Sequence, residues 1–206
     1  MKLSNRRAIG LALFGLAFGG LTMVTASECM GDHGPSGVND WLARPATASA
    51  LQVPGGGAPA ARLHGKGWQV YTCASRTAIG GSAPAYAWSL KAPDAQLFDA
   101  AGIPAGVHNA GPTWLSGDGS AVVAIRRAQA DAPVAGAVPW LLLEGRAWTG
   151  DGVFSHVAFI QRLNTSGGVA PGGGCDASTV NTETRVPYEA DYFFYGGPRG
   201  PDGPSP

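Results

Sequence analysis

The chain is divided into short apolar runs by glycine, proline and aspartate, and this division constrains its fold more than any other feature. Aromatic and β-branched residues occur in runs of about five to ten between these breakers. No window of a dozen residues repeats its apolar positions with the period of a helix. Short strands joined by turns are typical of an antiparallel sheet packed or closed on itself. We therefore predict an all-β fold, an antiparallel sandwich or barrel of about seven to nine strands.

Two of these runs show the alternation of a strand. In "GWQVYTC", Trp68 and Val70 alternate with Gln69 and Tyr71. Alternate residues of a strand point to opposite faces, so the two pairs are expected on opposite sides of the sheet. The final run, "VPYEADYFFY", places three aromatic residues on one face of a strand: Tyr188, Tyr192 and Phe194.

The stretch "GVHNAGPTW", residues 106–114, combines a histidine, a Gly-Pro pair and a tryptophan. Gly111 and Pro112 predict a loop or a strand–turn–strand junction. Such a junction fixes the direction of Trp114, which we expect to point inwards. His108 has no evident structural partner in the sequence, so this stretch is the first place to look for function.

Residues 1–26 have the three parts of a secretory signal peptide. A basic start is followed by an apolar run and by small residues that allow cleavage after Ala26. We therefore expect a secreted or periplasmic protein. A membrane anchor is the alternative, although the run is short for a span and interrupted by glycine. The pair Arg6-Arg7 leaves open whether export follows the general or the twin-arginine route.

The rest of the chain divides by composition. Residues 27–62 form an Ala/Gly/Pro-rich arm or linker with little to bury, residues 63–196 the β domain, and residues 197–206 a flexible tail. Within the arm, "VNDWLA" predicts one helical turn that anchors Trp41 on the main domain.

Charge excludes one class of partner. Removal of residues 1–26 takes away three of the 14 basic residues and none of the 14 acidic ones, which leaves a net charge of −3. The chain has no basic run, so nucleic acid is not an expected partner. We expect no membrane span after cleavage of the signal.

Export favours disulfide formation, and the chain has three cysteines. Cys73 ends a strand-like run, and Cys175 lies in a loop before the last one, so we pair these two. Cys29 remains near the start of the exported chain. The sequence alone admits all three pairings.

No motif indicates a reaction. The chain has no nucleophile elbow and no strand-to-helix glycine loop for phosphate or a dinucleotide. The histidines are far apart in the sequence, so neither a metal site nor a cofactor is predicted: His33, His64, His108 and His156.

Our first hypothesis is a non-catalytic domain that binds a carbohydrate or another small ligand. Aromatic rings facing solvent on a sheet form a platform for sugar rings, and polar neighbours fix the orientation. Four tryptophans are candidates, of which we expect at least half in the core: Trp88, Trp114, Trp140 and Trp148. The predicted ligand-binding set combines such rings with hydrogen-bonding side chains: His108, Trp114, Trp140, Gln161 and Tyr188.

Two alternatives remain. The first is a hydrolase or lyase in which His108 acts as acid or base with Asp99, Asp176 or Asp191. These aspartates are also typical of turn caps and arginine partners, and Arg162 would suit Asp176 or Asp191 as an ion pair. The second alternative is an envelope-associated structural protein without a ligand, in which every residue of the predicted set is buried. Solvent exposure of Trp114 and Trp140 separates this alternative from the first hypothesis.

Six blocks occur in one order along the chain: "GWQVYTC", "AQLFDAAG…GVHNAGPTW", "DGSAVV", "VPWLLL", "IQRLNTSGGVAP…CD" and "VPYEADYFFY". Together they resemble the domain-of-unknown-function 3455 family of secreted bacterial and fungal proteins, over about residues 63–196. Asn109 departs from the aromatic residue that this family usually has there. The resemblance implies a secreted, β-rich domain and brings no established activity, so no catalytic residue is carried over.

Overall fold

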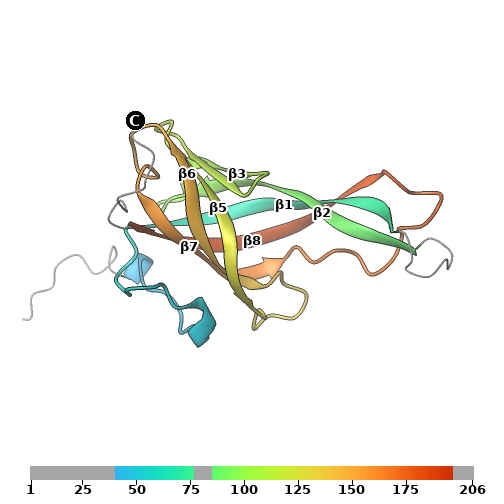
Figure 1. Cartoon of the computed structure of the whole chain (residues 1–206), viewed down its shortest axis with the longest axis horizontal. Helices are drawn as coiled ribbons and strands as arrows, with labels where there is room; N and C mark the ends of the chain where they lie inside the picture. The colour runs from blue at the N-terminus through green and yellow to red at the C-terminus, as the bar shows by residue number, and fades with distance from the viewer. Residues whose placement is uncertain (1–39, 77–84, 197–206) are drawn as a thin grey trace, which may run out of the picture. The chain divides into compact units, whose positions relative to one another are not determined.

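Eight antiparallel strands close into a barrel in a computed structural model, which describes residues 40–76 and 85–196 (Figure 1). Each strand pairs with its neighbours in the chain, and β8 pairs with β1. The predicted all-β class is confirmed, and the architecture is a barrel. The strands are β1 (Ala61–Arg76), β2 (Ala85–Phe98), β3 (Pro104–Asn109), β4 (Thr113–Ser116), β5 (Ala121–Ala130), β6 (Trp140–Thr149), β7 (Val157–Gly167) and β8 (Glu183–Gly196).

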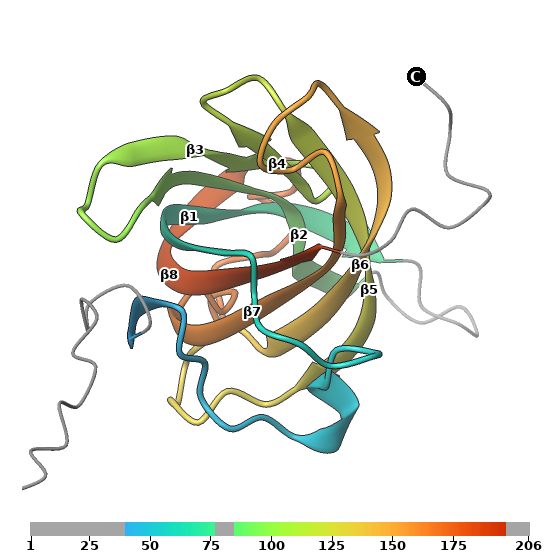
Figure 2. The same cartoon turned by 90° about the vertical axis from the view of Figure 1, so that its left-hand side faces the viewer.

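Turn residues produce the predicted reversals. Gly111 has a φ of 83° between β3 and β4, and Gly119 has a φ of 86° between β4 and β5. Glycine adopts this left-handed backbone without steric cost, which lets successive strands turn back on each other. Figure 2 looks into the resulting ring of strands, with β1, β8 and β7 neighbouring one another.

Alternation along β8 separates the inside of the barrel from its outside. Tyr188, Tyr192 and Phe194 belong to the inner core, as the sequence predicts, whereas Phe193 and Tyr195 belong to a second apolar cluster. The inner core is completed by aliphatic and aromatic side chains from the strands and from the β5–β6 and β6–β7 loops: Leu63, Ala95, Leu97, Trp114, Val122, Ala124, Val138, Leu143, Phe154, Val157, Ile160 and Ala190.

A glycine on β1 makes room for the largest inner side chains. Gly65 lies opposite Ala190, and a Cβ on it would be 2.7 Å from Cε2 of Tyr192. Tyr192 is fully buried, so its ring has no free space into which to move. The ring therefore packs directly on the backbone of β1.

The second apolar cluster lies outside the barrel, beneath the arm. The arm forms a short 3₁₀ turn, η1 (Ser49–Leu51), which buries Leu51 completely against Phe193 and Leu163. The arm was expected to have little to bury, but Leu51 and Val53 give it an apolar contact with the barrel. Leu51 and Val53 thus attach an Ala/Gly/Pro-rich segment to the barrel.

Trp41 anchors the start of the described arm, as predicted. Its Nε1–H donates to the carbonyl of Arg62 at 3.1 Å, and the Arg62 guanidinium lies 4.1 Å from the Trp41 ring centroid. Arg62 also pairs with Asp191 at 2.7 Å, and Asp191 accepts a hydrogen bond from Asn164. His64 contacts the other carboxylate oxygen of Asp191. This polar network holds the arm to β1, β7 and β8.

The Cys73–Cys175 disulfide is present, as predicted, and joins β1 to the β7–β8 loop. Cys29, the signal-like segment 1–26 and the tail 197–206 lie outside the described residues. Within residues 40–76 and 85–196, no helix is long and apolar enough to cross a membrane.

Candidate functional site

The structure separates the five residues of the predicted ligand-binding set into two groups. His108, Trp114 and Tyr188 face the inside of the barrel, whereas Trp140 and Gln161 lie outside it beneath the arm. All five are buried, and the tryptophans are 1% and 8% exposed. Trp114 and Trp140 therefore form no solvent-facing platform, and the five residues form no single patch.

Gln161 has a structural role. Its Nε2–H donates to the carbonyl of Leu51 at 2.6 Å, and its Oε1 accepts a hydrogen bond from the Tyr195 hydroxyl at 2.5 Å. Trp140 packs in the same outer cluster. Both residues therefore attach the arm to the barrel.

His108 and Trp114 face each other across the β3–β4 hairpin. Their rings are stacked, with centroids 4.2 Å apart and planes inclined by 13°. Nδ1–H of His108 donates to the carbonyl of Thr113 at 2.9 Å, which leaves Nε2 as a hydrogen-bond acceptor. Burial lowers the pKa of His108 to about 3, so the ring is uncharged at neutral pH. His108 thus acts as a neutral acceptor.

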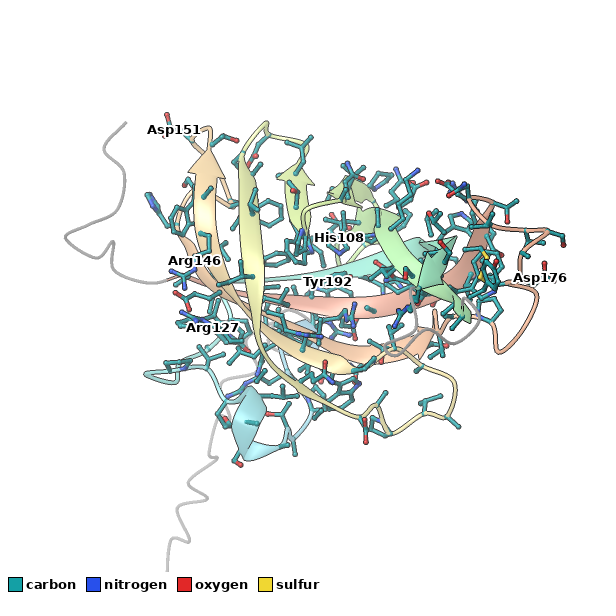
Figure 3. The ribbon with its side chains drawn as sticks, turned by 45° about the vertical axis from the view of Figure 1, so that its right-hand side comes forward. His108, Arg127, Arg146, Asp151, Asp176 and Tyr192 are labelled. Atoms are coloured by element: carbon teal, nitrogen blue, oxygen red, sulfur yellow. A yellow bond between two sulfur atoms is a disulfide. The ribbon has the colours of Figure 1, made fainter. Side chains whose placement is uncertain are left out.

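Three tyrosines extend this polar interior. The hydroxyls of Tyr188 and Tyr192 are 3.0 Å apart, and the Tyr192 ring packs edge-on against His108. The Tyr71 hydroxyl donates to the carbonyl of Gly168 at 2.6 Å. Burial raises the pKa of all three tyrosines, which keeps their hydroxyls protonated. Figure 3 shows His108 and Tyr192 beside each other.

Arg162 brings a positive charge to the same place. It lies opposite Tyr192 in the β7–β8 ladder, and residues directly opposite each other share a face of the sheet. Its Nε and Nη2 donate to the carbonyl of Pro139 at 3.3 and 2.8 Å. After burial, the Arg162 charge is the next influence on the pKa of Tyr71 and Tyr192. The guanidinium therefore lies within electrostatic reach of these hydroxyls.

Gln69 is the least satisfied residue of the interior. It follows Gly65 and Gly67 in the inward alternation of β1, and its Cγ lies close to Gly168. The side chain is 1% exposed, yet neither Oε1 nor Nε2 has a hydrogen-bond partner among the residues that the structure describes. The Nε1–H of Trp114 is also buried without a partner. A buried polar group left unpaired costs about 1–3 kcal/mol.

We call these residues the inner polar cluster: Gln69, Tyr71, His108, Trp114, Arg162, Tyr188 and Tyr192. Sequence reasoning found three of its members, His108, Trp114 and Tyr188, and missed Gln69, Tyr71, Arg162 and Tyr192 as site residues. One signal could have found the first two. Gln69 and Tyr71 share a face with Gly65 and Gly67, and small residues on that face accommodate large aromatic rings from the facing strands.

The aspartates proposed for catalysis do not contact His108. Asp99 and Asp176 cap turns, accepting backbone N–H groups of Ile103 and Ser178 respectively. Asp191 belongs to the outer network with Arg62. The predicted pairing of Arg162 with Asp176 or Asp191 is wrong, because Arg162 points inwards. In Figure 3, Asp176 lies well away from His108. Among the residues that the structure describes, no three His, Cys, Asp or Glu side chains are grouped as metal ligands.

Comparison with known proteins gives one match. The model of a family described as protein of unknown function, DUF3455, matches residues 54–196. This range begins in the arm, between Val53 and β1, and ends with β8. No curated protein and no solved structure matches the chain. The match covers more than half of the chain and contains the whole barrel, so the protein belongs to the DUF3455 family.

Proposed function

We propose that this protein is an extracytoplasmic binding protein that holds a small polar ligand inside its barrel. The signal-like segment at residues 1–26 supports export to the periplasm or the medium. An eight-stranded barrel is wide enough to be filled by side chains or to hold one small ligand. The inner polar cluster would form the site.

One observation carries this proposal. Gln69 is buried inside the barrel with both ends of its amide unpaired. Burial of the predicted set by itself is what the structural alternative without a ligand predicts. A filled structural core, however, favours apolar side chains or paired polar ones. An unpaired buried amide in the same barrel interior as two tyrosine hydroxyls and a neutral histidine supports a binding site there.

The stacking of His108 on Trp114 alters how a ligand would be held. Each of these two rings covers one face of the other, and Tyr192 makes an edge-on contact with both rings. A sugar ring stacked on Trp114 therefore has little support. Hydrogen bonds from Gln69, the tyrosine hydroxyls and the indole N–H carry the recognition.

The indole N–H signals of the tryptophans provide a test in solution. Neutral sugars and small organic acids are added at millimolar concentration to the ¹⁵N-labelled protein, and the indole resonances are assigned by Trp→Phe variants. We expect at least one probe to shift the Trp114 signal. Trp140 is an internal control, because its Nε1–H is also buried and unpaired but lies under the arm.

Matched variants locate the binding. Gln69→Leu removes the inward amide, whereas Gln96→Leu makes the same change at an exposed position on β2. We expect Gln69→Leu to abolish the Trp114 shift and Gln96→Leu to preserve it. The proposal fails if no probe moves the Trp114 signal, or if only the Trp140 signal or that of the exposed Trp68 moves.

A further inference from the structure

The interior of the barrel contains a cation without an anion. Arg162 faces inwards opposite Tyr192, and none of the ion pairs between described residues includes it. Asp191 is the one buried carboxylate in the described ranges, and it lies on the outer face with Arg62. The inner core itself consists of aliphatic and aromatic side chains.

The hydrogen bonds of Arg162 leave part of its guanidinium available. Nε and Nη2 both donate to the single carbonyl of Pro139, and the only side chain with which Arg162 hydrogen-bonds among the described residues is Tyr192. The carbonyl carries only a partial negative charge. Arg162 is half-buried, and a guanidinium partly withdrawn from water is stabilised most by a carboxylate, whose oxygens accept charge-assisted hydrogen bonds.

The surroundings of Arg162 indicate what else the ligand would carry. Arg162 lies opposite Tyr192 in the β7–β8 ladder, and its charge acts on the pKa values of Tyr71, Tyr188, Tyr192 and His108. Gln69 offers one amide donor and one acceptor, both unpaired. A hydroxyl group both donates and accepts, so it satisfies such an amide at both ends.

We propose, on the basis of the binding function inferred above, that the ligand is a small hydroxycarboxylate with one negative charge. Its carboxylate pairs with Arg162, and its hydroxyl groups bind Gln69 and the tyrosine hydroxyls. One guanidinium balances one charge. A phosphate monoester carries between one and two negative charges at neutral pH and would leave part of its charge uncompensated inside the barrel.

Acids and their neutral amides test the charge preference without altering the protein. Lactate and gluconate are each compared with their amide, and inorganic phosphate is added separately, with the Trp114 indole signal as the readout. We expect the acids to bind about 10- to 100-fold more tightly than their amides, because a hydrogen bond to a charged group is lost in the amide. We expect phosphate to bind more weakly than the acids.

Three substitutions of arginine residues complete the experiment. Arg162→Gln should weaken the binding of the acids by a similar factor and leave the binding of the amides unchanged. Arg127→Gln is the matched control, because Arg127 is an exposed arginine paired with Glu144. Arg162→Lys keeps the charge and should retain part of the acid preference even if Arg162→Gln folds poorly.

The outcomes separate this inference from the binding function. If acids and amides shift Trp114 equally, or if phosphate binds best, the barrel binds a ligand but the hydroxycarboxylate assignment is overturned. If none of these compounds shifts Trp114 while a neutral sugar does, the assignment is likewise overturned and the binding function stands. If nothing shifts Trp114, both fail.

Discussion

The imidazole of His108 lies flat against the indole of Trp114, with centroids 4.2 Å apart, and both rings are almost completely buried. The Gly-Pro turn between their strands brings them together, and the Thr113 carbonyl fixes the orientation of the imidazole. Burial keeps the histidine uncharged, and this links the stability of the barrel to pH.

The stability of the protein should fall as the pH falls below 6.5. Burial lowers the pKa of His108 to about 3 from the ordinary histidine value of 6.5. Between these values the unfolded chain binds a proton that the folded chain does not, so acid favours unfolding. The expected slope approaches about 1.4 kcal/mol per pH unit. Urea unfolding of the wild type and of His108→Phe, compared between pH 6.5 and 5, measures it.

Carboxylates contribute little in that pH range, because their ordinary pKa values are about 4. His108→Phe keeps an aromatic ring against Trp114 and removes the titrating group. The free energy of unfolding of His108→Phe should therefore change little between pH 6.5 and 5. An equal slope in both proteins would show that His108 is not the group responsible.

Replacing Gln69 by leucine should stabilise the protein. Leucine has a similar size and carries no buried polar atoms, so the substitution removes the cost of an unpaired amide, about 1–3 kcal/mol. Residues selected for binding often lower stability in this way. Thermal and chemical unfolding of Gln69→Leu measure the gain, and Gln96→Leu on the surface of β2 should change stability by less than about 0.5 kcal/mol. A clear loss of stability in Gln69→Leu would contradict the absence of partners for this amide.

Gly65→Ala should destabilise the barrel. The added methyl group would lie 2.7 Å from Cε2 of Tyr192, whose buried ring is enclosed by His108 and Trp114. Overpacking of this kind costs about 1–3 kcal/mol. Gly172→Ala is the control, because a Cβ there has no neighbour within 4 Å. Denaturation midpoints of the two variants should differ, with that of Gly65→Ala the lower.

Loss of the disulfide should lower stability by about 2–4 kcal/mol, since the bridge restricts a long segment of the unfolded chain. Cys175→Ser removes it, whereas Cys29→Ser should leave the unfolding free energy unchanged. Thiol titration of the unfolded, unreduced protein should find Cys29 reactive and Cys73 and Cys175 protected. Equal losses of stability in both serine variants would indicate that the bridge is formed differently in solution.

The strands could be predicted from the sequence, but which polar side chains face the inside of the barrel could not. Glycine turns and two-residue alternation are local properties, so they predict the hairpins and the inward face of Tyr188, Tyr192 and Phe194. Which side of the sheet becomes the inside depends on closure between β1 and β8, which separates Gln69 from the outward Trp68.

The roles of Arg162 and Gln161 illustrate the same limit. They are adjacent in the sequence and both polar, and nothing local shows which one faces inwards. Pairing of Arg162 with Tyr192 and of Gln161 with Phe193 decides it. The arm is a further case, because the carbonyl of the buried Leu51 accepts a hydrogen bond from Gln161, a donor that only the folded barrel brings to it.

Pairing of the first strand with the last also governs when the molecule can finish folding. β1 forms a ladder with β8 along most of its length, so residues near position 61 cannot pair until residues near position 194 are available. Contacts between such distant parts of a chain form slowly. Until β8 is available, β1 presents one unpaired edge, and unpaired edges invite association with other chains. A chain threaded through a membrane in the unfolded state could complete its barrel only after its C-terminal strand had emerged.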